Sequence, residues 1–196
     1  MMYEIIVIGV SLGGLRTLQT LLSGLPADFM LPMVIVQHRG SQGGEGLVPH
    51  LQKRSPIMIR EPEDKERILS GRVYLAPAGY HLMVDRNSFS LSTDAPVSYA
   101  TPSIDVLFDS AADSFGRHTL GLLLSGANHD GTEGLGRIKS VGGHTLVQDP
   151  STAACPVMPQ KAIDEGVVDR VLPLADIAAY LTTFNPSYKL LHAQSS

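Results

Sequence analysis

The chain has 196 residues, enough for one domain that buries roughly 70% of the surface exposed by its unfolded form. Its net charge of −4 argues against nucleic acid as the main partner, because phosphate binding requires a cationic face. The chain has a single cysteine, Cys155, which excludes an intrachain disulfide. The N-terminal apolar run is too short for a signal peptide or a membrane span. We therefore expect a cytoplasmic protein with no membrane insertion.

Short apolar runs alternate with amphipathic stretches along the chain, a pattern typical of an α/β domain with a mainly parallel sheet. In chain order the pattern predicts a strand at 3–8, a turn at 9–14, a helix at 15–22, a strand at 33–37, a helix at 45–54, a short strand at 56–60, antiparallel hairpins within 71–92, a helix at 103–115, a strand at 119–125, a helix at 132–141, a strand at 144–148, a helix at 158–165, a strand at 167–172 and a helix at 175–184. The expected fold is doubly wound and Rossmann-like, with an antiparallel hairpin appended, over residues 1–185, followed by a loose tail at 186–196.

The first turn, Gly9–Gly14, follows a strand and opens a helix. A dinucleotide site would need a bare glycine at the place of Ser11 and an acid at the end of the second strand, where the chain has Gln37 and His38. Both positions fail, so no nucleotide cofactor is expected. The turn also fits G-x-S-x-G, in which a tight strand-to-helix turn lifts a serine nucleophile above the sheet edge. On this turn alone, Ser11 is as well explained as a helix cap.

A serine nucleophile needs a base, and the base needs an orienting carboxylate. His38 ends the second predicted strand, and Asp130 follows the strand at 119–125, so both can reach the same sheet edge as Ser11. His129 is the rival base, and Asp130 by itself is better explained as the cap of the next helix. No spacing typical of a metal site appears. Cys155 has no evident base beside it and is interpreted as an inert thiol.

Six segments in order resemble the catalytic domain of the chemotaxis protein-glutamate methylesterases (CheB). They are IGVSLGG (8–14), VIVQHR (34–39), RVYLAPAGYHL (72–82), PSIDVLF (102–108), LLLSGANHDGTEG (122–134) and MPQKAI (158–163). The resemblance spans residues 5 to 185. It implies a parallel α/β sheet with a hairpin and a Ser-His-Asp triad at Ser11, His38 and Asp130. It also implies oxyanion donors near Leu12 and Ala127, and neither a cofactor nor a metal.

The activity that this resemblance implies is hydrolysis of glutamyl γ-methyl esters on the cytoplasmic helices of methyl-accepting chemotaxis receptors, with deamidation of receptor glutamines as a second reaction. The chain departs from the family pattern at Leu12, Ala127, His129 and Thr101. It also shows no receiver domain before its first strand, and a stand-alone catalytic domain is therefore expected. Two alternatives stay open: a catalytically silent chemosensory binding module, and a general esterase for small substrates.

Overall fold

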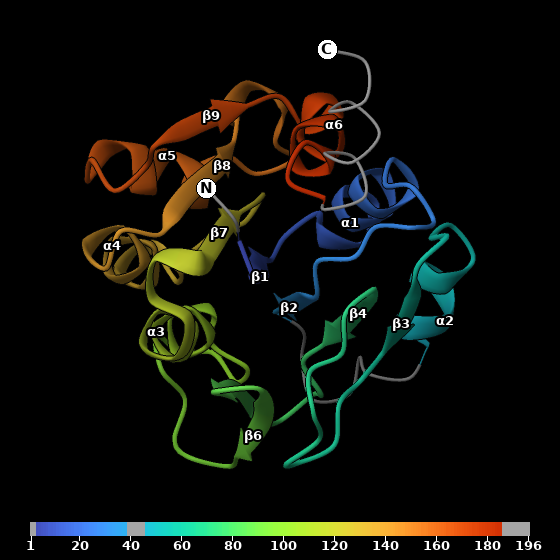
Figure 1. Ribbon diagram of the computed structural model, residues 1–196. Coiled ribbons are helices and arrows are strands. Elements are labelled where there is room, and N and C mark those ends of the chain that lie inside the picture. Colours follow the sequence, from blue (N-terminus) through green and yellow to red (C-terminus); the bar gives the residue numbers. More distant parts are fainter. Residues whose placement is uncertain (1–2, 39–45, 186–196) are drawn as a thin grey trace.

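The computed structural model describes residues 3–38 and 46–185. A seven-stranded parallel sheet forms the centre of the molecule, in the order β3-β4-β2-β1-β7-β8-β9 (Figure 1). The strands of this sheet are β1 (Ile5–Val10), β2 (Met33–Gln37), β3 (Met58–Arg60), β4 (Arg72–Leu75), β7 (Thr119–Leu123), β8 (His144–Gln148) and β9 (Arg170–Leu172). The fold class predicted from the sequence is thereby confirmed. The predicted tail at 186–196 lies outside the described residues.

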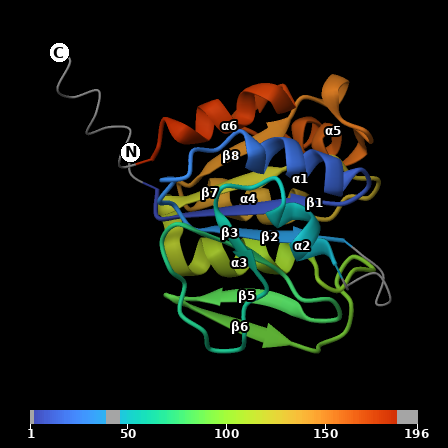
Figure 2. The same ribbon diagram turned by 90° about the vertical axis from the view of Figure 1, so that its right-hand side faces the viewer.

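Helices cover both faces of the sheet (Figure 2). Alternate side chains of the strands feed two apolar cores: in β1, Ile6 and Ile8 belong to one core and Ile5 and Val7 to the other. Burial on both faces explains why the parallel strands have nearly continuous apolar sequences. The first core is closed by α1 (Gly14–Ser23), α2 (Leu47–Gln52) and α6 (Leu174–Thr182), and the second by α3 (Ile104–Phe115), α4 (Thr132–Ser140) and α5 (Val157–Asp164).

One predicted element is wrong. Residues 71–92 were expected to form only hairpins, but β4 is a parallel strand of the main sheet between β2 and β3. Its residues Val73, Tyr74 and Leu75 are all fully buried, which favours an interior strand over an alternating hairpin. The hairpin itself consists of β5 (His81–Asp85) and β6 (Ser88–Ser92), which form a separate two-stranded sheet.

The hairpin packs against α3 and not against the edge of the main sheet. The Val84 N–H donates to Ser110 Oγ at 3.0 Å, and Ser114 Oγ donates to the Val84 carbonyl at 2.9 Å. Both serines belong to α3. The helix is therefore held between the main sheet on one side and the hairpin on the other (Figure 2), which fixes the position of its N-terminus near the ends of β1 and β2.

Gly9 allows α3 to lie directly on β1. A Cβ at this position would overlap Ile104 Cγ2 and lie 2.9 Å from Ile104 Cδ1. Ile104 is β-branched, so its Cγ2 cannot move away without rotating the whole side chain. We expect Gly9→Ala to lower the free energy of unfolding by about 1–3 kcal/mol, the usual effect of overpacking. Chemical denaturation tests this, and an unchanged midpoint would contradict it.

Candidate active site

Ser11 lies on the turn between β1 and α1. Its backbone N–H donates to the Ser125 carbonyl at 2.9 Å, and its carbonyl accepts from the Gly14 N–H at 2.9 Å. Gly13, the residue before α1, has φ 80°, and a Cβ there would lie 2.6 Å from Ala154 Cβ. Only glycine fits such a left-handed, crowded position. The tight turn therefore presents the Ser11 side chain at the carboxyl edge of the sheet.

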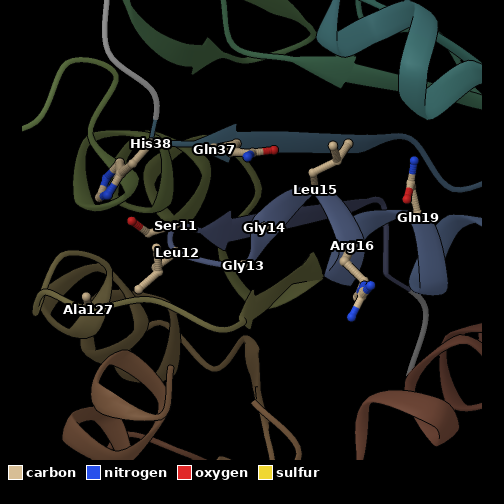
Figure 3. A pocket seen from close by; sticks show the side chains of 10 residues that line it. All are labelled: Ser11, Leu12, Gly13, Gly14, Leu15, Arg16, Gln19, Gln37, His38 and Ala127. Atoms are coloured by element: carbon tan, nitrogen blue, oxygen red, sulfur yellow. The ribbon is translucent and has the colours of Figure 1, made fainter. Parts of the chain in front are cut away.

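His38 directly follows β2, the strand beside β1. Val10 pairs with Gln37 in the parallel register, and the His38 N–H donates to the Val10 carbonyl at 3.0 Å. Ser11 directly follows β1 and His38 directly follows β2. Neighbouring strands in a sheet are about 4.8 Å apart, so the two residues lie side by side. Figure 3 shows both side chains at the same end of the strands, above the loop that carries Ala127.

Asp130 is fully buried beside His38. The His38 Nε2 lies 2.7 Å from Asp130 Oδ2. Three further donors reach the carboxylate from the start of α3: the Ile104 N–H at 2.7 Å, the Asp105 N–H at 2.9 Å and Ser103 Oγ at 2.9 Å. Burial alone raises the pKa of Asp130, but the hydrogen bonds from His38, Ile104 and Asp105 outweigh burial and lower it. The carboxylate is therefore held ionised.

Asp130 does not cap the following helix, which was the alternative role expected for it. The residue that precedes α4 is Gly131, with φ 97° and no side-chain cap. Asp130 instead accepts from the first N–H groups of α3, where the free donors of a helix favour a negative charge. Asp130 therefore anchors a helix other than its neighbour in sequence, while it also binds His38.

The orientation of the His38 ring assigns its two nitrogens different partners. A carboxylate only accepts, so the Nε2 beside Asp130 carries the proton and Nδ1 has a free lone pair. That lone pair faces the Asn128 side-chain amide at 3.2 Å. Within the described residues, no hydrogen bond joins Ser11 to His38. The structure thus brings His38 and Asp130 into contact and places Ser11 next to His38, without a hydrogen bond between Ser11 and His38.

An open pocket of about 710 Å³ lies beside these groups. Leu12, 59% exposed, forms part of its wall. The N–H groups of Leu12 and Ala127 donate to no other described residue, so both are available to a ligand, as the sequence-based prediction requires. The residues that line the pocket are Ser11, Leu12, Gly13, Gly14, Leu15, Arg16, Gln19, Gln37, His38 and Ala127 (Figure 3).

The rival groups lie elsewhere. His129 lines a separate pocket of about 450 Å³ together with Glu133 and Lys161. The backbone of Cys155 contacts the loop that follows β7: its N–H donates to Ser125 Oγ at 2.9 Å and its carbonyl accepts from the Gly126 N–H at 3.1 Å. Within residues 3–38 and 46–185, no group of three His, Cys, Asp or Glu side chains is placed to hold a metal ion.

Three contributing residues escaped the sequence-based prediction. Ser103 caps α3 by accepting from the Val106 N–H at 3.5 Å, and its hydroxyl also donates to Asp130 Oδ1 at 2.9 Å. Asn128, in the loop before α4, places its side-chain amide 3.2 Å from His38 Nδ1. The buried ring of His81 accepts from the Ser103 N–H at 3.2 Å. The PSIDVLF segment was the one available signal, since it carries Ser103 and the start of α3.

The chain is similar to known proteins over most of its length. The family model described as CheB methylesterase matches residues 6–181. A protein of Leptospira interrogans (strain Fiocruz L1-130) is 46% identical over 179 residues, which cover 91% of this chain and 93% of the relative. The protein-glutamate methylesterase/protein-glutamine glutaminase 2 of Anaeromyxobacter dehalogenans is 44% identical, over 89% of this chain and 51% of its own length.

A solved structure is also similar. The CheB methylesterase catalytic domain of Thermotoga maritima superposes with a TM-score of 0.88 at 33% identity, covering 92% of this chain and 98% of that chain. No helix of the described residues is both long and apolar enough to pass through a bilayer.

Proposed function

The chain belongs to the CheB methylesterase family, and from this membership we propose that it hydrolyses glutamyl γ-methyl esters on chemotaxis receptors through Ser11, His38 and Asp130. The observation that carries the proposal is the buried Asp130 carboxylate 2.7 Å from His38 Nε2, with Ser11 at the adjacent strand end. An alcohol, an imidazole and a carboxylate in this order form a complete nucleophile, base and orienting group.

Proton transfer in this site runs through His38 Nδ1. Nε2 donates to Asp130, so Nδ1 is the nitrogen that accepts the Ser11 proton as the serine oxygen attacks the ester carbonyl. The Asn128 amide, now 3.2 Å from Nδ1, gives way to the Ser11 hydroxyl when substrate is bound. Asp130 then stabilises the imidazolium and keeps the ring oriented.

The oxyanion of the tetrahedral intermediate lies between the two loops that flank Ser11. The unused N–H groups of Leu12 and Ala127 are the donors, each contributing about 3 kcal/mol to the transition state by comparison with other oxyanion holes. Because both donors are backbone groups, Leu12 and Ala127 serve as well as other residue types would. The start of α1 adds the partial positive charge of a helix N-terminus.

Collapse of the intermediate breaks the ester C–O bond, and His38 returns its proton to the departing methoxide, which leaves as methanol. Water then attacks the acyl-Ser11 carbonyl, giving its proton to His38, and the second collapse frees the glutamate carboxylate and restores the serine. The same steps on a glutamine side chain release ammonia in place of methanol. The open pocket suits a side chain presented on the surface of a receptor's cytoplasmic helix.

Methanol release from a methylated receptor fragment tests the proposal. We expect turnover with the receptor fragment to exceed turnover with p-nitrophenyl acetate in kcat/KM, and a fluorophosphonate to label Ser11. Labelling of Ser11 with better turnover of the small ester would favour a general esterase. Absence of both labelling and methanol would reject the hydrolase and favour a binding module at the same edge of the sheet.

A further inference from the structure

Asp105 is a buried carboxyl group that the proposed mechanism does not use. It lies in the first turn of α3 and is 6% exposed. Its backbone N–H donates to Asp130 Oδ1 at 2.9 Å, while its own Oδ1 accepts from the N–H groups of Gly131 at 2.9 Å and Gly134 at 2.8 Å. One residue therefore holds both Asp130 and the chain that follows it.

The packing around Asp105 leaves it little freedom. At Gly134, a Cβ would overlap Phe108 Cβ and lie 3.2 Å from Asp105 Cα, so α3 and α4 approach as closely as a glycine allows. The Asp105 side chain is enclosed between the two helices at this crossing. A change in its hydrogen bonding is consequently transmitted to Asp130 and cannot be absorbed by movement of the side chain.

Two carboxyl groups share this enclosed space, and they do not ionise equally. Asp130 has His38 as a partner and stays ionised. Burial, together with the charge and the hydrogen bonding of Asp130, raises the pKa of Asp105 to about 7 against the opposing hydrogen bonds of Gly134 and Gly131. Below that pH, Asp105 holds a proton that it can donate to the Asp130 carboxylate.

Other ionisable groups lie on the elements packed around Asp105, including Asp113 on α3 and, in the last turn of α4, Arg137 and Lys139. Along α3 itself, Asp109 is one turn further on. Glu133 lies in the first turn of α4, and His81 of β5 contacts the chain at Ser103. Of the ionisable groups, Asp130 is the one that Asp105 contacts directly, and Asp130 in turn connects Asp105 to His38.

We propose that Asp105 is a positioning residue for the Asp130–His38 pair, which it holds in place through its N–H and through the proton on its carboxyl group. This inference rests on the proposed function of the same site. Loss of the proton removes one donor to Asp130 and places a second negative charge behind it. The kcat of the wild-type protein then falls as the pH rises through about 7, with little change in KM.

Asparagine at position 105 imitates the protonated acid at every pH. The amide oxygen accepts from Gly131 and Gly134, and the amide nitrogen donates to Asp130. For Asp105→Asn we expect wild-type kcat below pH 7 and a severalfold higher kcat than wild type above it. Asp105→Ala leaves both glycine N–H groups without an acceptor and removes the carboxyl donor to Asp130, while the backbone N–H at position 105 stays. We expect kcat to fall roughly 10²-fold at all pH values, the effect of a small displacement of catalytic groups.

The experiment measures kcat and KM for methanol release on both sides of pH 7, together with the rate of fluorophosphonate labelling of Ser11. The matched control is Asp109→Asn, the same change one turn along the same helix, for which we expect the wild-type pH profile. Carboxyl ¹³C NMR adds a direct reading: one resonance that titrates near pH 7 should be missing from Asp105→Asn.

The outcomes separate the two proposals. Superimposable pH profiles for wild type and Asp105→Asn, or wild-type kcat in Asp105→Ala, overturn the positioning role. If Asp105→Ala is poorly folded, the Asp105→Asn profile and the NMR titration decide alone. A wild-type protein that releases no methanol, yet labels Ser11 at a rate that depends on Asp105 as described, rejects the receptor substrate and supports the positioning role.

Discussion

Replacing Ser11 with alanine is expected to abolish methanol release, with kcat reduced roughly 10⁶-fold, as when other triad hydrolases lose their nucleophile. Among the described residues that line the pocket, no other offers an alcohol beside His38: Leu12, Leu15 and Ala127, for example, have no nucleophilic atom. Fluorophosphonate labelling should disappear with the hydroxyl. Methanol measured by gas chromatography, under single-turnover conditions if necessary, gives the readout.

The fold should survive the loss of this hydroxyl. The turn at Ser11 is held by its backbone, through the hydrogen bonds to Ser125 and Gly14, and alanine keeps both. We therefore expect an unchanged denaturation midpoint. Ser23→Ala is the matched control. Ser23 is exposed and ends α1, the helix that follows Ser11, so this variant should retain full activity. Turnover near the wild-type rate in Ser11→Ala would mean that another residue is the nucleophile.

The second large effect is expected for Asp130→Asn, with a loss of about 10⁴ in kcat, as for triad acids that are changed to amides. An asparagine can donate its amide N–H to His38 Nε2. Nε2 must then accept this hydrogen bond, and the imidazole ring carries its proton on Nδ1. The ring in that tautomer cannot take the proton of Ser11. A loss of only a few-fold in kcat would remove Asp130 from the proposed triad.

Unlike Ser11→Ala, this change should also weaken the fold. Asp130 Oδ1 accepts from the Asp105 N–H and Oδ2 from the Ile104 N–H, so the amide nitrogen of asparagine opposes a backbone donor in either orientation. We expect a loss of about 1–3 kcal/mol in the free energy of unfolding, the effect of a buried unpaired polar group. Asp85→Asn on the exposed end of β5 is the control.

The pH dependence of stability gives a further check on Asp130→Asn. The pKa of Asp130 is lowered in the folded protein, so its contribution to stability is present above the ordinary carboxyl pKa and is lost as the pH falls below it. The variant lacks this contribution. The difference in unfolding free energy between wild type and variant should therefore be largest near neutral pH and shrink in acid; a difference independent of pH would contradict an ionised Asp130.

The sequence was sufficient to predict that Ser11 and His38 follow neighbouring strands at one edge of the sheet. Parallel strands end at one edge of a sheet, and both Ser11 and His38 directly follow buried apolar runs whose positions the pattern predicts. The register of β1 and β2 then makes the two residues neighbours. Local patterns of this kind are strong when a strand is buried on both faces and its end is marked by glycine or a polar residue.

The contacts behind the proposed triad could not be predicted, because they join segments that are distant in the chain. Ser103 and Asp105 reach Asp130 from more than 20 residues away, and nothing in the local sequence of either segment specifies the crossing of α3 with α4. The parallel strand β4 was missed for a related reason. Four residues are too few for a period to be recognised, and the neighbouring hairpin residues dominated the pattern.

The contacts of Asp130 have a consequence for descendants of this gene that abandon hydrolysis. The turn that carries the serine is held by backbone hydrogen bonds, and within the described part of the chain the hydroxyl adds none to it, so drift can remove the hydroxyl freely. Asp130 connects the start of α3 to the loop before α4. Selection for a folded product therefore retains this aspartate after catalysis has ceased. Among inactive descendants, a preserved aspartate is therefore poor evidence of enzymatic activity, and the serine is the position to inspect.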